Sequence, residues 1–223
     1  MNYRFRINQD FGRFPSEKMK AFKDVPVANL GDVMNRMACV SGNMKPINQH
    51  ALLGSAYTVK VADGDNLMLY YAIDNAQAGD VIVVDGGDYA YRALCGEIMI
   101  SYAQARGIAG FVVNGAIRDA DVLSQMDIPV YYCHISPNGP YKNGPGEVNY
   151  PITIQDQIVN PGDLVVGDGD GLIFIPQSQA NDILREVKEI QTSETDKLKS
   201  IHENGTLDVS WLYKKLDELK VDY

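Results

Sequence analysis

The chain has 223 residues, 45% hydrophobic and 22% charged, which suits an ordinary globular protein with a sizeable core. A formal net charge of −9 disfavours partners that carry dense negative charge, so we expect neither nucleic acid nor a membrane surface as a ligand. Three scattered cysteines and the absence of any long apolar window predict a cytoplasmic protein without disulfide bonds, a zinc cluster, a signal peptide or a membrane span.

The first part of the chain predicts an N-terminal arm and a helix. Residues 1–25 are polar and mixed, with a short helix predicted over Glu17–Phe22. Asn29 follows as a possible N-cap, because Asn side chains accept hydrogen bonds from the free N–H groups of a first helical turn. The apolar residues at helical spacing behind it are Leu30, Val33, Met34 and Met37.

The middle of the chain alternates between strands and helices. The predicted strands cover residues 56–61, 81–85, 111–113 and 128–132. The predicted helices cover residues 67–75, 89–106 and 120–126, and Gly86-Gly87-Asp88 is expected to end the strand before the second of them. This order is typical of an α/β fold with a parallel sheet.

The last part of the chain changes character twice. A loop over residues 136–146 precedes strands predicted over 148–154, 163–166 and 171–176. Residues 178–220 are charged and carry two apolar stripes separated by Asn204-Gly205, which predicts two helices. We therefore expect one α/β domain over residues 1–177 and a helical extension over residues 178–223.

Candidate chemistry is concentrated at the predicted ends of two strands. Polar residues at the carboxyl ends of strands in an α/β sheet are where ligands usually bind. Arg118 offers a planar fork that fits a carboxylate, and Asp119 offers hard oxygen to a divalent cation. Together they suit a 2-oxo acid, whereas a surface ion pair or a turn-capping Asp is the alternative explanation of the same dipeptide.

Other motifs are weaker. Gly86-Gly87-Asp88 lacks the spacing of a nucleotide-binding loop, and the three histidines are isolated in the sequence. Lys60 lies between Val59 and Val61 on a strand, so its side chain is expected to point away from the apolar face rather than act as a Schiff-base lysine.

Four blocks resemble one known family. They are Ala78 to Asp85, Gly96 to Met99, Gly107 to Asp119, and Pro161 to Gly171. In order and spacing they look like the RraA-like family, which includes 4-hydroxy-4-methyl-2-oxoglutarate aldolases, 4-carboxy-4-hydroxy-2-oxoadipate aldolases and the regulator of ribonuclease activity. The resemblance covers roughly residues 28 to 177.

The resemblance implies an α/β/β/α sandwich with a swivelling β/β/α core like that of phosphohistidine domains, to which the C-terminal helices are added. It also implies assembly as homotrimers or homohexamers with sites at the subunit boundaries. The C-terminal helices are then expected either to close over a neighbour's site or to serve oligomer packing alone.

The family signature is an acidic residue, twenty further residues and Arg-Asp, and here Glu97 precedes Arg118-Asp119 at that spacing. By this match Arg118 holds the substrate carboxylate and Asp119 binds Mg²⁺ or Mn²⁺. Gly96, Glu97, Ile98 and Met99 line the substrate, largely through backbone N–H groups. The acidic position is often Asp in the family, and Glu97 is longer by one methylene. The acid–base group for the aldol hydroxyl is expected to be a water, either bound to the metal or positioned by Glu97.

The implied activity is that of a metal-dependent lyase. The metal stabilises the pyruvate enolate left by retro-aldol cleavage or by oxaloacetate decarboxylation. One alternative is a non-catalytic, protein-binding regulator of ribonuclease activity, which has no need of a metal carboxylate beside Arg118. Another is a sugar-acid lyase or dehydratase on the same fold.

Overall fold

The computed structural model describes residues 5–40 and 42–222 of the chain. Residues 1–4 of the predicted arm and residue 223 of the predicted extension therefore lie outside the described residues. The helices are α1 (Ser16–Met19), the 3-10 helix η1 (Lys20–Phe22), α2 (Val27–Val33), α3 (Leu67–Asn75), α4 (Glu97–Ala105), α5 (Ala120–Leu123), α6 (Ala180–Asn204) and α7 (Ser210–Glu218). The strands are β1 (Phe5–Ile7), β2 (Lys45–Pro46), β3 (Leu52–Val61), β4 (Asp80–Cys95), β5 (Gly110–Ile117), β6 (Val130–Ile135), β7 (Gly146–Val148), β8 (Ile152–Ile154), β9 (Gln157–Val159), β10 (Leu164–Asp168) and β11 (Gly171–Ile175).

The centre of the sheet is parallel, as the alternation of strands and helices predicts. Strand β3 pairs with β4, β4 with β5 and β5 with β6, each in parallel register. The run Val81–Val84 of β4 is fully buried, which is expected where both faces of a parallel strand are covered. The carboxyl ends of these strands consequently meet at one edge of the sheet.

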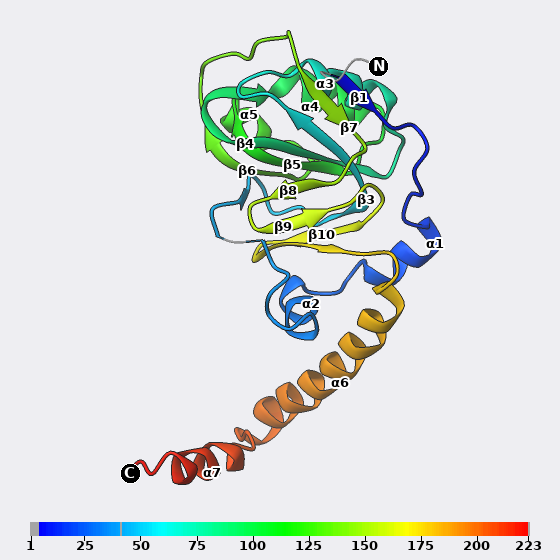
Figure 1. Ribbon diagram of the computed structural model, residues 1–223. Helices are drawn as coiled ribbons and strands as arrows, with labels where there is room; N and C mark the ends of the chain where they lie inside the picture. Colours follow the sequence, from blue (N-terminus) through cyan, green and yellow to red (C-terminus); the bar gives the residue numbers. More distant parts are fainter. Residues whose placement is uncertain (1–4, 41, 223) are drawn as a thin grey trace.

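Strand β3 belongs to two layers of the molecule. Its first half, Leu52 to Ser55, pairs antiparallel with β10, and its second half, Ser55 to Lys60, pairs with β4. Strands β10 and β11 form a hairpin, which lies beneath the main sheet in the view of Figure 1. The small β8–β9 sheet lies between this hairpin and the main sheet in the same view. One continuous strand therefore joins the two β layers.

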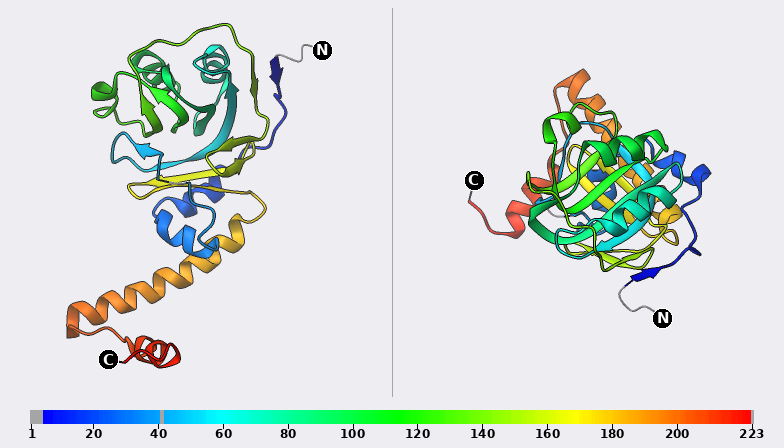
Figure 2. Two further views of the ribbon diagram at one scale, coloured as in Figure 1. Left: turned by 60° about the vertical axis from the view of Figure 1, so that its left-hand side comes forward. Right: turned by 90° about the horizontal axis from the view of Figure 1, so that it is seen from above.

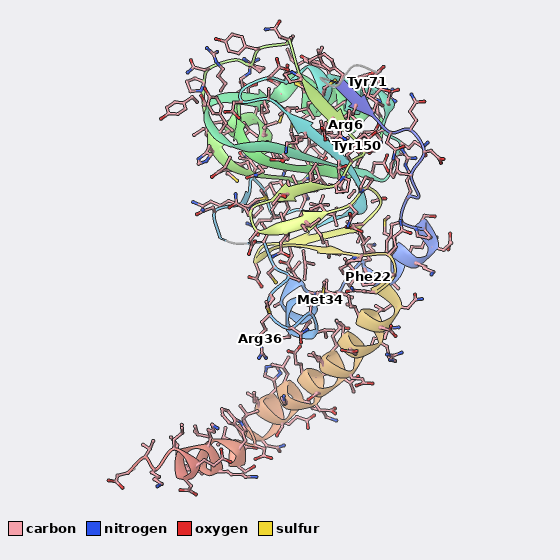
Figure 3. All side chains as sticks on the ribbon, in the orientation of Figure 1. Arg6, Phe22, Met34, Arg36, Tyr71 and Tyr150 are labelled. Atoms are coloured by element: carbon pink, nitrogen blue, oxygen red, sulfur yellow. The ribbon has the colours of Figure 1, made fainter. Side chains whose placement is uncertain are left out.

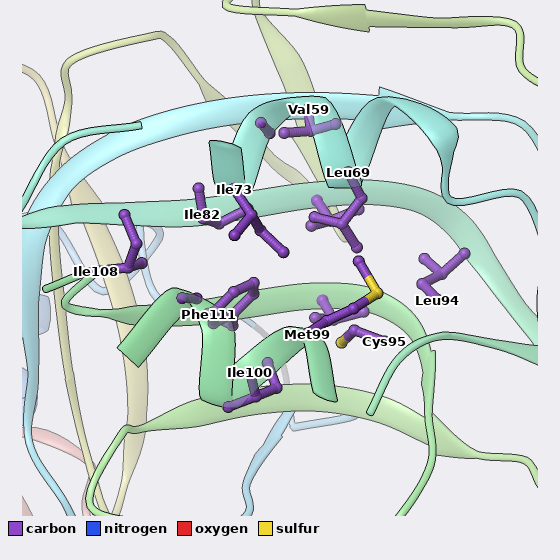
Figure 4. Close-up of a cluster of buried hydrophobic side chains, with 14 of the residues drawn as sticks. Val59, Leu69, Ile73, Ile82, Leu94, Cys95, Met99, Ile100, Ile108 and Phe111 are labelled. Atoms are coloured by element: carbon purple, nitrogen blue, oxygen red, sulfur yellow. The ribbon is translucent and has the colours of Figure 1, made fainter. Parts of the chain in front are cut away.

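Three apolar clusters separate four layers, as expected for an α/β/β/α sandwich. The first lies between the main sheet and helices α3 and α4, where Figure 4 shows Ile73 and Ile100 close to Phe111. The second lies between the main sheet and the strands β8 to β11. The third lies between the β10–β11 hairpin and helices α2 and α6, and Figure 3 labels Phe22, one of its members, beside the start of α6.

The stretch after Gly86 differs from the predicted helix over residues 89–106. Strand β4 continues to Cys95, because Tyr89, Ala93 and Cys95 pair with β5 through a series of register shifts. Helix α4 begins only at Glu97, immediately after Gly96. Bulged pairing with a partner strand leaves no regular alternation in the sequence, so the prediction was wrong for residues 89–95.

The predicted cap of the first long helix was also wrong. Helix α2 begins at Val27 after Pro26, so Asn29 lies inside the helix and its side chain is buried. The Asn29 amide donates a hydrogen bond to Glu194 Oε2 of α6 at 2.9 Å. Met37 lies beyond the helix and is exposed, since α2 ends at Val33.

The C-terminal helices extend from the base of the body (Figures 1 and 2). Helix α6 ends at Asn204, and Gly205 adopts the left-handed conformation with φ 65°, as the predicted stop requires. Among the described residues, none of the helices is both long enough and apolar enough to cross a bilayer.

Candidate functional site

The ends of β4 and β5 bring two distant segments together. Cys95 pairs with Ile117, and the Arg118 N–H donates to the Cys95 carbonyl oxygen at 3.0 Å. Gly96 and Arg118 consequently leave the sheet side by side. Helix α4 starts on one of these segments, and the Arg118-Asp119 dipeptide occupies the other.

Arg118 and Asp119 converge on the first turn of α4. The Glu97 N–H donates to Asp119 Oδ2 at 3.0 Å, and Arg118 Nε lies 3.6 Å from the same oxygen. Asp119 adopts a left-handed conformation with φ 59°, which Asp tolerates better than most residues. A carboxylate at this place is stabilised by the positive end of the helix dipole. The two side chains therefore point to one place rather than apart.

Gly96 is required by this convergence. A Cβ atom at Gly96 would collide with Asp119 Oδ2 and would lie 2.8 Å from Arg118 Cγ. The absence of a side chain lets both polar groups approach the backbone that precedes α4. The glycine predicted to line the substrate is thus also a steric condition for the Arg118–Asp119 arrangement.

A small pocket of about 150 Å³ opens beside Arg118. Its volume is below the roughly 300–1,000 Å³ of sites for drug-sized ligands, so it suits a small molecule. The lining residues are Asn66, Tyr70, Ala93, Leu94, Cys95, Gly96, Ile98, Met99, Arg118, Gly139, Pro140 and Lys142. Four of the six predicted site residues are among them, which are Gly96, Ile98, Met99 and Arg118.

Glu97 and Asp119 are near the pocket but are not among its lining residues. The side chain of Glu97 is exposed, whereas the backbone N–H of Glu97 donates its hydrogen bond to Asp119. The side chain of Asp119 is 37% exposed, and that of Arg118 is 42% exposed. Solvent can therefore reach both side chains of the ion pair.

The start of α4 gives the pocket an electropositive backbone. The first N–H groups of a helix have no acceptor within it, and Ile98 and Met99 belong to the first turn of α4. Both residues line the pocket together with the Arg118 guanidinium. Free N–H groups and a guanidinium are an established combination for binding a carboxylate.

Cys95 lies in the pocket wall but does not serve as a nucleophile. Burial, followed by the negative charge of Asp119, raises the pKa of the Cys95 thiol to about 12. Thiolate, which is the reactive form, is consequently scarce near neutral pH. No histidine is found among the described residues that line the pocket, and His134 instead contacts Asp88 at 2.8 Å.

Lys60 is exposed, as the strand alternation predicts, and lies 3.6 Å from Asp85 Oδ2. It is absent from the pocket lining that the described residues form. Lys60 is therefore neither desolvated nor placed for Schiff-base chemistry in this pocket.

A divalent cation is compatible with Asp119 as a single protein ligand. Within residues 5–40 and 42–222, no cluster of three His, Cys, Asp or Glu side chains is arranged to hold a metal. Mg²⁺ commonly binds proteins through one or two carboxylates and completes its shell with water and substrate oxygens. The donor set at Asp119 fits a cation of that kind, which a chelating substrate would help to hold.

Three polar lining residues were not identified from the sequence: Asn66, Tyr70 and Lys142. Asn66 precedes α3, whereas Lys142 lies in the loop before β7. Asp65-Asn66 at the end of a predicted strand was the only available signal, and it resembles an ordinary turn.

Comparison with known proteins identifies a family and similar sequences. The family model described as RraA-like, Aldolase/RraA, matches residues 27–174. A protein of Halalkalibacterium halodurans named "Putative 4-hydroxy-4-methyl-2-oxoglutarate aldolase" is 35% identical over 184 residues, which cover 82% of this chain and 88% of that protein.

Two solved structures share the fold. The RNA-processing inhibitor RraA from Thermus thermophilis superposes with a TM-score of 0.64 at 28% identity, covering 69% of this chain and 93% of that one. An uncharacterized protein from Pseudomonas syringae pv. tomato superposes with a TM-score of 0.79 at 22% identity, covering 89% and 98%. The second similarity concerns the fold alone.

Proposed function

This chain belongs to the RraA-like Aldolase/RraA family, and on that premise we propose that it is a lyase that cleaves carbon–carbon bonds in small 2-oxo acids. The reaction is retro-aldol cleavage of substrates of the 4-hydroxy-4-methyl-2-oxoglutarate type to pyruvate, decarboxylation of oxaloacetate, or both. The observation that carries the proposal is the convergence of Arg118 and Asp119 on the start of α4, beside a small pocket.

Arg118 and the first turn of α4 bind the substrate carboxylate. The guanidinium donates two parallel hydrogen bonds, and the N–H groups of Ile98 and Met99 are available as further donors. Binding at three or more points fixes the orientation of the 2-oxo group relative to the bond that breaks.

The same donors stabilise the charge that develops during cleavage. When the C3–C4 bond breaks, its electron pair passes to C3 and the negative charge is shared with the C2 oxygen. Donors already aimed at this region need no reorganisation, which is the basis of electrostatic catalysis. A divalent cation held by Asp119, Mg²⁺ or Mn²⁺, would supply Lewis-acid polarisation of the oxo group.

Retro-aldol cleavage also removes a proton from the C4 hydroxyl. Cys95 is unsuited to accept it, because the pKa of its buried thiol is raised to about 12 and the group stays protonated. We assign the proton to a water positioned by the exposed carboxylate of Glu97. This proton then returns to C3 of the enolate, which completes pyruvate. Decarboxylation of oxaloacetate releases CO2 and needs a proton from water at C3, but removes none from a hydroxyl, so Glu97 is expected to matter more for the aldol reaction.

A pyruvate-release assay tests the proposal. Purified protein is given oxaloacetate or 4-hydroxy-4-methyl-2-oxoglutarate, with Mg²⁺, with Mn²⁺ or with EDTA. We expect metal-dependent turnover of at least one substrate, lowered by about 10²–10³-fold in Asp119→Ala. Asp121→Ala is the matched control, because it removes an exposed carboxylate two residues away. Full activity in EDTA, or an unimpaired Asp119→Ala variant, would contradict the mechanism.

A second candidate function is a protein-binding regulator without catalytic activity. The similarity to the RNA-processing inhibitor from Thermus thermophilis favours it. This regulatory function would be supported over the lyase function by two results together. The protein would turn over neither substrate, and it would bind a ribonuclease measurably.

We also propose that the chain assembles as a homotrimer or homohexamer. Exposed apolar side chains come from the segments that border the pocket, among them Tyr91 (73% exposed), Ile98 (75%) and Tyr141 (53%). Such side chains are typical of surfaces that contact another subunit. Sedimentation equilibrium measures the assembly, and a monomer at all concentrations would contradict it.

A further inference from the structure

A second pocket, of about 180 Å³, lies between the N-terminal arm and the body of the molecule. The arm, strand β3, the second half of α3 and the segments after α3 and β7 contribute its lining: Gln9, Phe11, Arg13, Tyr57, Tyr71, Asn75, Gln77 and Asn149. None of these described residues lines the pocket beside Arg118. The proposed lyase reaction therefore makes no use of this second pocket.

Asn149 presents an unused hydrogen-bond acceptor to the second pocket. The residue is 2% exposed, and its Oδ1 has no hydrogen-bond partner among the described residues. Its Nδ2 donates to the Asn8 carbonyl oxygen at 3.0 Å, so turning the amide over would place two acceptors against each other. Buried polar atoms are almost always paired. The Oδ1 acceptor therefore calls for a donor from a molecule in the pocket.

The backbone holds Asn149 in place from two sides. The Asn149 N–H donates to the Thr58 carbonyl oxygen at 2.8 Å, and the residue adopts the left-handed conformation with φ 56°, which Asn tolerates better than most residues. The Asn8 N–H, on the arm, donates to the Val148 carbonyl oxygen at 3.0 Å. The acceptor is thus fixed before any ligand arrives, which lowers the entropy cost of binding.

Tyr57 supplies a donor next to this acceptor. The residue is 3% exposed, and burial raises the pKa of its hydroxyl, while the neighbouring Asn149 amide lowers that pKa by a smaller amount. The hydroxyl consequently stays protonated near neutral pH and is able to donate. An acceptor beside a donor matches the N–H and C=O groups that stand side by side in a carboxamide or a lactam.

The walls of the second pocket are aromatic and carry no net charge. The rings of Phe11 and Tyr57 pack edge to face with centroids 5.7 Å apart, and Tyr71 adds a third ring. Arg13 is the one charged side chain among the described lining residues, and Asp80 neutralises it through hydrogen bonds of 2.9 and 3.0 Å. An ionic ligand would lose its hydration here without gaining a counter-charge. A neutral ligand with a flat ring suits such walls.

We propose that the second pocket binds a small neutral ligand in which an amide is attached to, or part of, one planar ring. The ligand N–H donates to Asn149 Oδ1, and the ligand carbonyl oxygen accepts from the Tyr57 hydroxyl. Because Gln9, Phe11 and Arg13 line the pocket from the arm, the bound ligand also fastens the arm to the body.

Three probes of nearly the same shape test the proposal: benzamide, acetophenone and benzoate. Benzamide carries both the donor and the acceptor, acetophenone lacks the N–H, and benzoate carries a negative charge. NMR titration of the full chain gives the three dissociation constants. We expect benzamide to bind about tenfold more tightly than acetophenone, because the ketone leaves Asn149 Oδ1 unpaired. We expect benzoate to bind at least about tenfold more weakly than benzamide, because its charge is not compensated.

Hydrogen exchange tests the link to the arm. The arm residues must leave the pocket when the arm opens, so the ligand has to be released first. Benzamide at about ten times its dissociation constant should therefore slow exchange in residues 8–14 roughly tenfold. Exchange in α7 of the same sample, which lies in the extension, should not change.

Two variants separate the two hydrogen bonds. Asn149→Gly removes the amide at a position whose φ of 56° suits glycine, and it should abolish the preference for benzamide over acetophenone. Tyr57→Phe removes only the hydroxyl, so it should keep this preference and weaken both ligands about three- to tenfold. The matched controls are Asn35→Gly, at an exposed asparagine with φ 60°, and Tyr102→Phe on α4, and neither should change the affinities.

Wild-type protein that binds benzamide and acetophenone equally, binds benzoate more tightly, or shows no saturable response to benzamide would overturn the inference. A trapped water would then be the partner of Asn149 Oδ1. An Asn149→Gly variant that keeps the tenfold preference would overturn it as well, and if this variant does not fold, the preference of wild type decides. None of the probes is a 2-oxo acid, so these results are independent of the pyruvate-release assay.

Discussion

The body of the molecule and its C-terminal extension have equally regular secondary structure but opposite burial. In the body, helix α4 buries Met99, Ile100 and Ala103 against the sheet. In the extension, α6 buries residues only as far as Val187, and α7 has none among its described residues. The exposed apolar residues of the extension are Leu198, Ile201, Leu207, Trp211, Leu212, Tyr213, Leu219 and Val221. An amphipathic pattern thus predicts a helix without telling which surface covers its apolar face.

The largest expected effect comes from truncating an aromatic residue in each region. Phe111→Ala removes a fully buried ring between the sheet and α4, and we expect a loss of about 3–5 kcal/mol in the free energy of unfolding. Trp211→Ala, at a residue 66% exposed on α7, should cost about 0.5 kcal/mol or less. Urea unfolding at low protein concentration gives both values. Similar losses of unfolding free energy in the two variants would contradict the difference in burial between the two regions.

A sharper comparison uses two isoleucines of the same helix. Ile183 of α6 is 6% exposed and packs with the α2 cluster, whereas Ile201 is 39% exposed. Ile183→Ala should cost about 2–4 kcal/mol and Ile201→Ala less than about 1 kcal/mol, because only the first leaves a cavity. If the cost of Ile201→Ala rises with protein concentration, another subunit buries the second half of α6.

Hydrogen exchange extends the comparison to the backbone. The hydrogen-bonded amides of α3, α4 and β5 lie beside the first apolar cluster, and we expect them to exchange only through global unfolding. Amides in α7 should exchange by local opening, faster by several orders of magnitude. Mass spectrometry of peptic fragments measures the difference. Equal protection of α7 and α4 in dilute protein would contradict it.

The smallest effect concerns the thiols of the body. Burial is the chief cause that raises the pKa of the Cys95 thiol and that of the Cys133 thiol, each to about 12. A raised pKa leaves less thiolate at any given pH, so both should resist iodoacetamide at pH 8 while the exposed Cys39 is alkylated first. The pKa of Cys39 is itself raised, so its labelling should quicken as the pH rises toward 9. Labelling of all three in guanidinium is the control.

The sequence was sufficient for much of the fold, because regular apolar patterns mark regular elements. Helix α3 was predicted over its observed bounds, and the parallel order of β3 to β6 followed from the alternation of strands and helices. Residues 89–95 were predicted as a helix because bulged pairing with β5 leaves no periodic signal. The Asn29 cap failed because α2 begins at Val27, directly after Pro26, where Asp168 Oδ2 of a distant strand accepts the Val27 N–H.

The candidate site divides in the same way. The Arg118 region was predictable because its residues are close in sequence to a recognisable strand end. Lys142 and Asn66 were not, since their proximity depends on Asp65 binding backbone N–H groups 78 and 79 residues away. Hydrogen bonds between distant backbone segments leave no pattern in composition or spacing.

The double pairing of β3 also has a consequence during biosynthesis. The first half of this strand finds its neighbour in β10, which leaves the ribosome roughly a hundred residues later, or about 5–20 seconds at ordinary elongation rates. Until then β3 can already pair with β4, but the backbone groups that will later bind β10 stay exposed on the nascent chain. We expect that chaperones acting on newly made chains meet this protein chiefly in that interval.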